Sequence, residues 1–309
     1  MPVGLITHSD CLLHDMGDEH IESPARIKSI QELLDSSGLG YSVKHIEAIK
    51  ATKDQLRLAH DERYIESIFD ASPESGIVIL DPDTSLNPHS LNAALYAAGA
   101  GIQAVDQIMS DELSSAFCLT RPPGHHAEYD RAMGFCIFNN ISIAACYAKQ
   151  KYKLERIAIV DFDVHHGNGT ENIVKNQEGI TFFSLFQHPY YPFSGAESSA
   201  SNIINSPMDA GSGSQPFRDI ISNVWVTKLN ELKPQLILVS AGFDAHAQDG
   251  ISEIKLKDED YRWVTEELSY IAKKYAKGRI ISTLEGGYHL DSLARSVVAH
   301  INVLIVNQA

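Results

Sequence analysis

A buried strand near the middle of the chain runs directly into alternating carboxylate and imidazole side chains. The apolar residues 157–160 predict the strand, and Asp161, Asp163, His165 and His166 follow it before a glycine-rich turn. If the extended conformation continues through residue 165, then Asp161, Asp163 and His165 share one face. Asp163 and His165 could then bind one cation. This pair supplies two metal ligands, and the site requires a third.

Two further predicted strand ends carry side chains that could complete such a site. The strand expected at 236–240 leads into Asp244, which holds the same position relative to its strand as the first carboxylate ligand, and we assign it as the third ligand. The strand expected at 116–119 leads into RPPGHHA, a rigid turn that presents His125 and His126. Two carboxylates and one imidazole leave an open position on a cation, as in catalytic zinc sites.

These residue types together predict hydrolysis of an amide. The paired histidines could act as general base on a water and as general acid on the leaving amine. Tyr288, in the glycine turn after a strand expected at 279–284, could share the developing oxyanion with the metal. Asp161, Glu285 and Asn168 are candidates to orient the histidines by accepting a hydrogen bond from ring Nδ1–H.

The alternation of strands and helices predicts an α/β fold with a single open, mostly parallel sheet flanked by helices on both faces. We interpret residues 1–309 as one domain. The expected strands are 3–6, 116–119, 157–160, 179–185, 236–240 and 279–284, and the expected helices are 24–38, 54–70, 91–108, 140–147, 217–232 and 258–275. Asn140 and Asp258 are expected to cap helices, and 81–88 and 187–213 to be loops.

Two polar features near the N-terminus each allow two interpretations. Arg26 lies in the first turn of its predicted helix, where a cation is unfavourable, so it has either a specific acidic or carbonyl partner or a solvated head on the surface. The segment 10–22 is dense in Asp, Glu, His and Cys. Because these residues lack regular spacing, we interpret the segment as a polar loop, with a metal site as the alternative.

Composition indicates which kinds of partner the protein could bind and in which cellular compartment it is expected. The formal charge of −15 argues against binding of nucleic acid and suits a cationic partner, although a solvated acidic surface is the simpler interpretation. The N-terminus lacks a secretory pattern and no run of 18 apolar residues occurs, so we expect a cytoplasmic protein that does not bind membranes. The four cysteines form no CxxC pair, which predicts buried free thiols.

Five segments in fixed order, RPPGHHA, GFCIFNN, DFDVHHGNGT, SAGFDA and LEGGY, resemble the motif series of the histone deacetylase family. These are the zinc-dependent members of the arginase/deacetylase superfamily, and HHGNG and LEGGY resemble its class II branch, including bacterial members. The resemblance runs from Arg26 in ESPAR to Tyr288. It implies the arginase/deacetylase fold and removal of acetyl groups from lysine side chains, with one zinc ion per chain and a structural potassium ion.

The resemblance also implies a role for each matching residue. It makes Asp163, His165 and Asp244 the zinc ligands, His126 the general base and acid, His125 its electrostatic partner paired with Asp161, and Tyr288 the group that polarises the acetyl carbonyl. It assigns Asp161, Asp163, His165, Ser184 and Leu185 to the potassium site, and Arg26 to the channel that releases acetate. Asn168 departs from the aspartate of class I, and this change should leave His126 less basic.

The residues that the resemblance assigns to substrate surround the acyl chain. They are Phe135 and Tyr191 as tunnel walls, Gly134 and Gly286 beside them, and Asp83 at the rim, with Tyr191 standing where phenylalanine is more usual. Relatives that select acetylated polyamines carry an acidic gatekeeper about seven residues after the third zinc ligand, and this chain has Ile251 there. An apolar rim favours acyl-lysine or another apolar acyl amide, while nearby Asp249 keeps acetylpolyamine hydrolysis as the alternative.

Three questions stay open at the level of sequence. A binuclear manganese ureohydrolase would share the fold but needs more carboxylate ligands than this pattern supplies. A catalytically silent module that binds acyl peptides is the alternative that is not an enzyme. The sequence also leaves open whether copies of the chain form a homo-oligomer.

Overall fold

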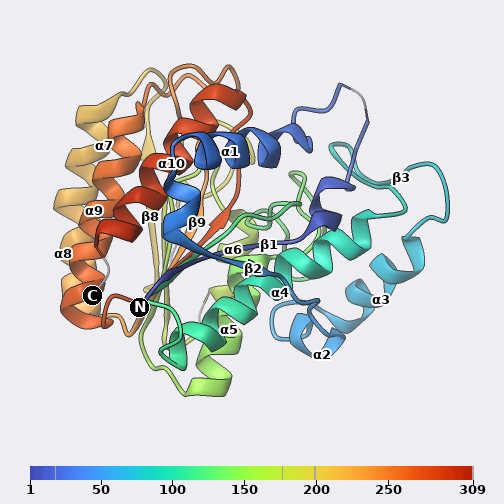
Figure 1. The fold of residues 1–309 in the computed structure, drawn as a ribbon, viewed down its shortest axis with the longest axis horizontal. Coiled ribbons are helices and arrows are strands. Elements are labelled where there is room, and N and C mark those ends of the chain that lie inside the picture. The colour runs from blue at the N-terminus through green and yellow to red at the C-terminus, as the bar shows by residue number, and fades with distance from the viewer. Residues whose placement is uncertain (18, 176, 198–199, 308–309) are drawn as a thin grey trace.

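The structure is organised around an eight-stranded parallel sheet with the order β2-β1-β5-β10-β9-β6-β7-β8. Figure 1 shows the fold and labels strands β1, β2, β8 and β9 of this sheet. The structure is a computed structural model that describes residues 1–17, 19–175, 177–197 and 200–307. The strands are β1 (Val3–Thr7), β2 (Val43–Glu47), β5 (Ser115–Cys118), β6 (Ile157–Asp161), β7 (Ile180–Gln187), β8 (Ile203–Met208), β9 (Leu236–Ala241) and β10 (Ile280–Leu284). A separate antiparallel hairpin joins β3 (Val78–Asp81) and β4 (Thr84–Leu86).

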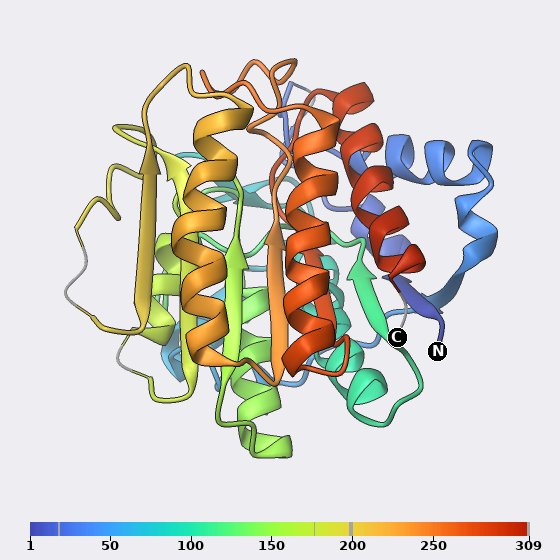
Figure 2. The ribbon, with the colours of Figure 1, turned by 90° about the vertical axis from the view of Figure 1, so that its left-hand side faces the viewer.

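Helices cover both faces of this sheet, which confirms the predicted fold class (Figure 2). They are α1 (Ala25–Ser36), α2 (Lys53–Leu56), α3 (Glu62–Ala71), α4 (Ser90–Met109), α5 (Asn140–Tyr152), α6 (Asn168–Val174), α7 (Ser214–Ile220), α8 (Val226–Leu232), α9 (Asp258–Tyr275) and α10 (Leu290–Val306). Short 3-10 turns are η1 (Ser9–Leu12) and η2 (Leu39–Ser42), and the π-helical segment η3 (Ile221–Trp225) joins α7 to α8. Helices α7 to α10 line one face, and α4 and α5 lie on the other.

The strand sequences place a hydrophobic core on each face of the sheet. Along β6, Ile157 and Ile159 pack into the core that includes the inner sides of α4 and α5. Ala158 and Val160 pack into the second core, which includes α9 and α10. Successive side chains of a strand point to opposite faces, so a strand buried on both sides is apolar throughout. This explains why the central strands are recognisable as continuous apolar runs.

Three local predictions about helices were wrong. The helix expected at 54–70 is two helices, α2 and α3, and Asp61 begins the second by accepting a hydrogen bond from Arg63 N at 2.8 Å. Asn139, rather than Asn140, caps α5, with its Oδ1 accepting from Ser142 N at 3.0 Å. Helix α9 begins at Asp258, but the residue at its N-cap position is Lys257.

The sequence patterns missed elements at the edges of the sheet. Strand β8 lies inside the segment 187–213 that is expected to be a loop, and its sequence IINSPM is interrupted by polar residues and a proline. Strands β2 and β8 are the two edge strands, which are partly exposed and tolerate polar residues and proline. Two elements outside this sheet were also missed. The hairpin β3–β4 occupies part of the expected loop 81–88, and helix α10 was not predicted.

The prediction of buried thiols is confirmed, because Cys11, Cys118, Cys136 and Cys146 are all free and buried. Within the described part of the chain, no helix is both long enough and apolar enough to cross a bilayer.

Candidate active site

The four loops that carry the predicted site follow four adjacent strands in the centre of the sheet. These strands are β5, β10, β9 and β6 in spatial order, and the chain visits them in a different order. All four run parallel, so their carboxyl ends meet at one edge. Strand β6 ends at Asp161, which contradicts the assumption that the extended conformation continues to His165. The backbone bends at residues 163–165 instead, and Nδ1 of His165 still lies 3.0 Å from Oδ1 of Asp163.

The predicted metal ligands converge. Ligand atoms of Asp163, His165 and Asp244 all lie within 4.8 Å of one another, and the three residues are buried. Nδ1 of His165 lies 3.0 Å from Oδ1 of Asp163 and 3.1 Å from Oδ2 of Asp244. Backbone amides fix the carboxylates, since Gly286 N donates to Asp163 at 2.8 Å and Val164 N donates to Asp244 at 2.9 Å.

Two observations indicate that this cluster fits a metal ion. Oδ2 of Asp244 is buried and lacks a hydrogen bond, although His165 Nδ1 is close, so these two atoms face each other as two ligands of one cation would. A Cβ atom at residue 286 would lie 2.2 Å from Oδ2 of Asp244 and 2.6 Å from Oδ2 of Asp163, so Gly286 keeps this space open. Two carboxylates and one imidazole are a donor set typical of a catalytic divalent metal.

The two tandem histidines have different partners. Nδ1 of His125 lies 3.0 Å from Oδ2 of Asp161, and Nδ1 of His126 lies 2.7 Å from Oδ1 of Asn168, as the sequence predicts. Glu285 does not orient a ring, which corrects the prediction for this residue. Its Oε2 accepts instead from the backbone N–H groups of Gly124 at 2.7 Å and His125 at 3.1 Å, and this holds the turn that presents both rings.

The electrostatic environment shifts the pKa values of the two imidazoles in opposite directions. Burial alone would lower the pKa of His125, but the carboxylates of Asp163 and Asp161 outweigh it and raise that pKa to about 10. Burial, together with the neighbouring rings of His125 and His165, lowers the pKa of His126 well below 6.5. The pKa values of the two neighbouring rings are therefore shifted in opposite directions.

A pocket of 190 Å³ opens beside His165, one of the three candidate metal ligands. Its lining residues are Asp83, His126, Gly134, Phe135, His165, Tyr190, Tyr191, Ile251 and Tyr288. It thus contains every residue that was predicted to contact substrate except Gly286, which lies against the two carboxylate ligands instead. Tyr190 was not predicted. Its ring stacks on the ring of His165 at 5.5 Å, and the only signal in the sequence is its place beside Tyr191.

Aromatic rings and a strained turn shape the pocket. Tyr191 contacts His126 edge to face at 5.2 Å, and Phe135 contacts Tyr288 in the same way at 5.9 Å. Gly134 and Phe135 both have positive φ angles, of 58° and 68°. A Cβ atom at residue 134 would lie 2.4 Å from the His126 ring, so only glycine fits there. The strained backbone of Phe135 aims its ring across the pocket.

Arg26 has specific partners, which decides between the two interpretations of this residue. It is fully buried, its Nε donates to Gly287 O at 2.6 Å, and its guanidinium lies 5.0 Å from the centre of the Tyr288 ring. It also pairs with Glu22 at 3.0 Å. Glu22 in turn binds the guanidinium of Arg121, with 2.6 Å between Oε2 and Nη2. The polar segment 10–22 therefore supplies a buried counter-ion, and among the described residues its side chains form no metal cluster.

This buried ion cluster predicts a pH-dependent contribution to stability. Burial alone would raise the pKa of Glu22, but Arg121 and Arg26 outweigh it and lower that pKa from 4.5 to about 2. The stabilisation is therefore fully present above pH 4.5 and is lost as the pH falls toward 2. Glu22→Gln should lower the free energy of unfolding at pH 7 by about 3–5 kcal/mol, because it leaves buried arginines unpaired. Urea denaturation followed by circular dichroism measures this loss.

The matched control is Glu266→Gln, which breaks an exposed pair with Arg262 whose atoms lie 3.0 Å apart. Its expected cost is below about 1 kcal/mol. Equal losses in the two variants would contradict the assigned role of Glu22.

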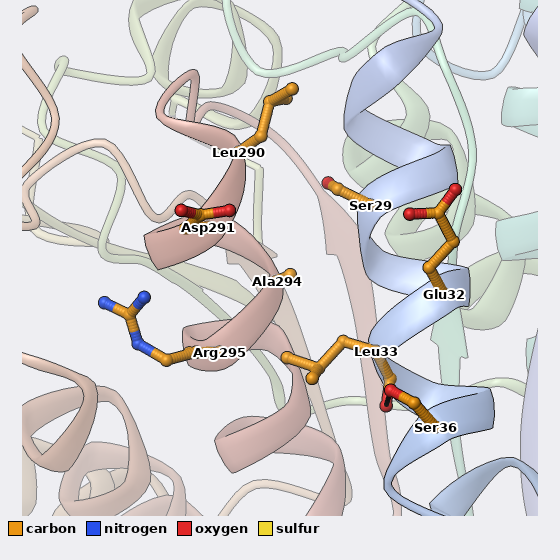
Figure 3. A pocket seen from close by; sticks show the side chains of 8 residues that line it. All are labelled: Ser29, Glu32, Leu33, Ser36, Leu290, Asp291, Ala294 and Arg295. Atoms are coloured by element: carbon orange, nitrogen blue, oxygen red, sulfur yellow. Dashed lines mark hydrogen bonds between the residues drawn. The ribbon is translucent and has the colours of Figure 1, made fainter.

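A larger hollow of 510 Å³ lies between α1 and α10 and carries none of the predicted site residues (Figure 3). Its lining residues are Ser29, Glu32, Leu33, Ser36, Leu290, Asp291, Ala294 and Arg295. The guanidinium of Arg295 is engaged by Asp258 at 2.8 Å. Size alone therefore does not identify the functional pocket, and the convergent polar groups favour the smaller one.

Comparison with known proteins agrees with this geometry. A sequence model described as "Histone deacetylase domain" matches residues 20–304. The chain belongs to the histone deacetylase family. A histone deacetylase-like amidohydrolase of Pseudomonas aeruginosa is 36% identical to it over 276 residues, which cover 87% of this chain and 72% of that protein. The crystal structure of the HDA15 HD domain matches with a TM-score of 0.93 at 30% identity, covering 99% of this chain and 88% of that chain.

A polyamine deacetylase, HDAC10 of Mus musculus, is 34% identical over 332 residues, which cover 99% of this chain and 48% of that protein. This chain therefore spans about half of that relative.

Membership of the histone deacetylase family makes this chain a hydrolase that acts on amides. The described residues contain a single set of three side chains with metal-ligand geometry, so the second metal set of a ureohydrolase is not found among them.

Proposed function

We propose that this histone deacetylase family member is a zinc-dependent hydrolase that removes acetyl or other acyl groups from lysine side chains. The observation that carries the proposal is the pocket with aromatic walls whose lining includes His126, Tyr288 and His165, the last being one of the three candidate metal ligands. Its volume of 190 Å³ suits a linear acyl-lysine arm rather than a bulky ligand. Asp163, His165 and Asp244 would hold one zinc ion, which supplies Lewis-acid polarisation of the acyl carbonyl and of the attacking water.

Three residues around the proposed zinc site have different catalytic roles. His126, as the neutral imidazole, takes a proton from the attacking water and later donates it to the leaving amine. His125, as the cation paired with Asp161, stabilises negative charge as it develops. Tyr288 keeps its proton, since burial raises the pKa of this phenol well above 10, and its hydroxyl donates to the oxyanion.

The rim of the pocket supports acyl-lysine over acetylated polyamine. Ile251, the residue at the gatekeeper position, lines the pocket with an apolar side chain. Asp249, which kept the polyamine alternative open, is 4% exposed, and its Oδ2 accepts from the backbone amides of Tyr288 at 2.6 Å and His289 at 3.1 Å. A carboxylate held in this way is buried beneath the rim and poorly placed to bind a substrate ammonium group.

Several finer assignments belong to the same proposal. Asp83 would accept a backbone N–H from a peptide substrate at the rim, with its Oδ1 fixed by Gly134 N at 3.0 Å. Arg26 would guide acetate away while its guanidinium supports the Tyr288 ring. Asp161, Asp163, His165, Ser184 and Leu185 would hold a structural potassium ion where β6 meets β7, mostly through main-chain oxygens. Asp161 and Ser184 are register partners there. The cytoplasmic location stays a prediction from the sequence.

Tyr288→Phe should lower kcat by roughly 10²-fold on an acetyl-lysine peptide, because it removes one donor to the oxyanion. The zinc-loaded protein is assayed on that peptide and on N-acetylputrescine side by side, by detecting the released acetate. Faster turnover of the peptide, lost in the variant, supports the proposal.

Two other outcomes of this assay would contradict it. Faster turnover of N-acetylputrescine would move the assignment to acetylpolyamine hydrolysis and overturn the argument from Ile251. Binding of acyl peptides without turnover of either substrate would instead favour the silent binding module.

A further inference from the structure

A carboxylate lies directly behind the residue that orients the catalytic base. Oδ1 of Asn168 faces Nδ1 of His126 at 2.7 Å, and Nδ2 of the same amide donates to Oε1 of Glu128, also at 2.7 Å. Asn168 is 8% exposed, and the Glu128 side chain is 21% exposed and pairs with Arg131 at 3.0 Å. The three side chains form one hydrogen-bonded row from the substrate pocket toward the surface.

The asparagine in this row could bind its neighbours in two orientations. The two ends of a carboxamide have nearly the same shape but opposite hydrogen-bonding character. An ionised carboxylate accepts hydrogen bonds only, so Glu128 requires the NH₂ end of Asn168 on its side. The sulfur of Met133, a weak acceptor 3.3 Å from Nδ2, favours the same orientation. The oxygen end is then left to face His126.

The orientation of the amide decides which nitrogen of His126 carries the proton. Facing an oxygen, Nδ1 must be the protonated nitrogen, and Nε2 keeps the lone pair that a general base needs. If the amide turned over, Nδ1 would accept from its NH₂ group and the proton would move to Nε2. In that tautomer His126 could not take a proton from water at Nε2.

We propose that Glu128 is a positioning residue, which fixes the orientation of Asn168 and thereby the catalytic tautomer of His126. The inference rests on the proposed hydrolase function. It also accounts for the departure of this chain from the class I pattern. An aspartate at this position offers an acceptor to His126 in either orientation and needs no such support. An asparagine could adopt either orientation unless an anion such as Glu128 accepts from its NH₂ group.

The position of Glu128 predicts which kinetic constant depends on it. Glu128 and Asn168 line a hollow of 260 Å³, and the residues that line this hollow are different from those that line the substrate pocket. Loss of Glu128 should therefore lower kcat and leave KM within about twofold.

The experiment is a double-mutant cycle on the zinc-loaded full chain. Glu128→Ala should lower kcat about 10- to 100-fold, the usual cost of losing a group that orients an active-site ligand or base. In the Asn168→Asp background, the same substitution should leave kcat unchanged or raise it, because it removes a carboxylate from contact with the new aspartate. Glu266→Ala, which also breaks a glutamate–arginine pair, is the control and should change neither background.

A second readout does not require turnover. In protein labelled with ¹⁵N in its histidine rings, the His126 signals are assigned by their loss in His126→Gln. The wild type should show protonated Nδ1 and unprotonated Nε2, and Glu128→Ala should show a mixture of tautomers. If the wild type turns over no acyl amide, the proposed function fails, and this spectrum alone decides the role of Glu128.

Two results would overturn the inference. One is an equal loss of kcat in the wild-type and Asn168→Asp backgrounds, which is the expectation for a purely structural glutamate. The other is an unchanged His126 tautomer in Glu128→Ala.

Discussion

Asp244→Asn should abolish stoichiometric zinc binding and lower turnover of an acetyl-lysine peptide by roughly 10⁴-fold, because activation of the water and polarisation of the carbonyl are lost together. The substitution removes one of three charged or basic ligands while preserving the shape of the side chain. Oδ1 of Asp244 accepts from Val164 N at 2.9 Å, and the amide oxygen of asparagine can still accept this bond. The fold is therefore expected to survive, and zinc content per chain is measured alongside kcat.

The matched control for this variant is Asp258→Asn. Asp258 is a carboxylate at the start of α9 that pairs with Arg295 at 2.8 Å, away from the pocket. The Asp258→Asn protein should still bind one zinc ion per chain and turn over the peptide at the wild-type rate. An Asp244→Asn protein that still bound one zinc ion per chain and retained more than about a tenth of the activity would show that Asp244 is not a required ligand.

His126→Gln should lower kcat by about 10³-fold while leaving zinc content unchanged, because a glutamine can neither take nor donate the proton in transit. His126 lines the pocket and makes edge-to-face contacts with Tyr191 and His165. A glutamine fills much of that space, so KM should change little. Steady-state kinetics and zinc analysis on the same preparation separate loss of chemistry from loss of metal.

The comparison with His125→Gln tests how the two histidines divide their roles. We propose that His125, paired with Asp161, stabilises charge and does not carry the proton, so His125→Gln should lower kcat less than His126→Gln does. If His125→Gln were the more damaging change, the assignment of the general base would pass from His126 to His125.

The residues that form the candidate site could be located from sequence because its parts are local. Asp163 and His165 are two residues apart, and His125 and His126 are adjacent in a turn fixed by two prolines and a glycine. Central strands such as β6 are buried on both faces, so their apolar runs identified the sheet and the loops at its carboxyl edge. A parallel sheet brings those loops together whatever their separation along the chain.

Other features depended on contacts between distant segments, which no short pattern encodes. The edge strands β2 and β8 are partly exposed and contain polar residues, so their sequences resemble loops. The partners of Glu285 are the backbone amides of Gly124 and His125, which lie 161 and 160 residues away along the chain. The pairing of Arg26 with Gly287 spans 261 residues.

The sequence by itself therefore determined the class of fold. It also located the three candidate metal ligands, the histidine pair and the tyrosine, since each belongs to a short pattern of residue types at the end of an apolar strand. Only the tertiary structure decided how these groups are held. It assigned Glu285 to the backbone of the histidine turn, buried Asp249 beneath the rim, and placed Glu128 behind Asn168. The physical reason is that orientation depends on which donor meets which acceptor, and that depends on packing between segments remote in sequence.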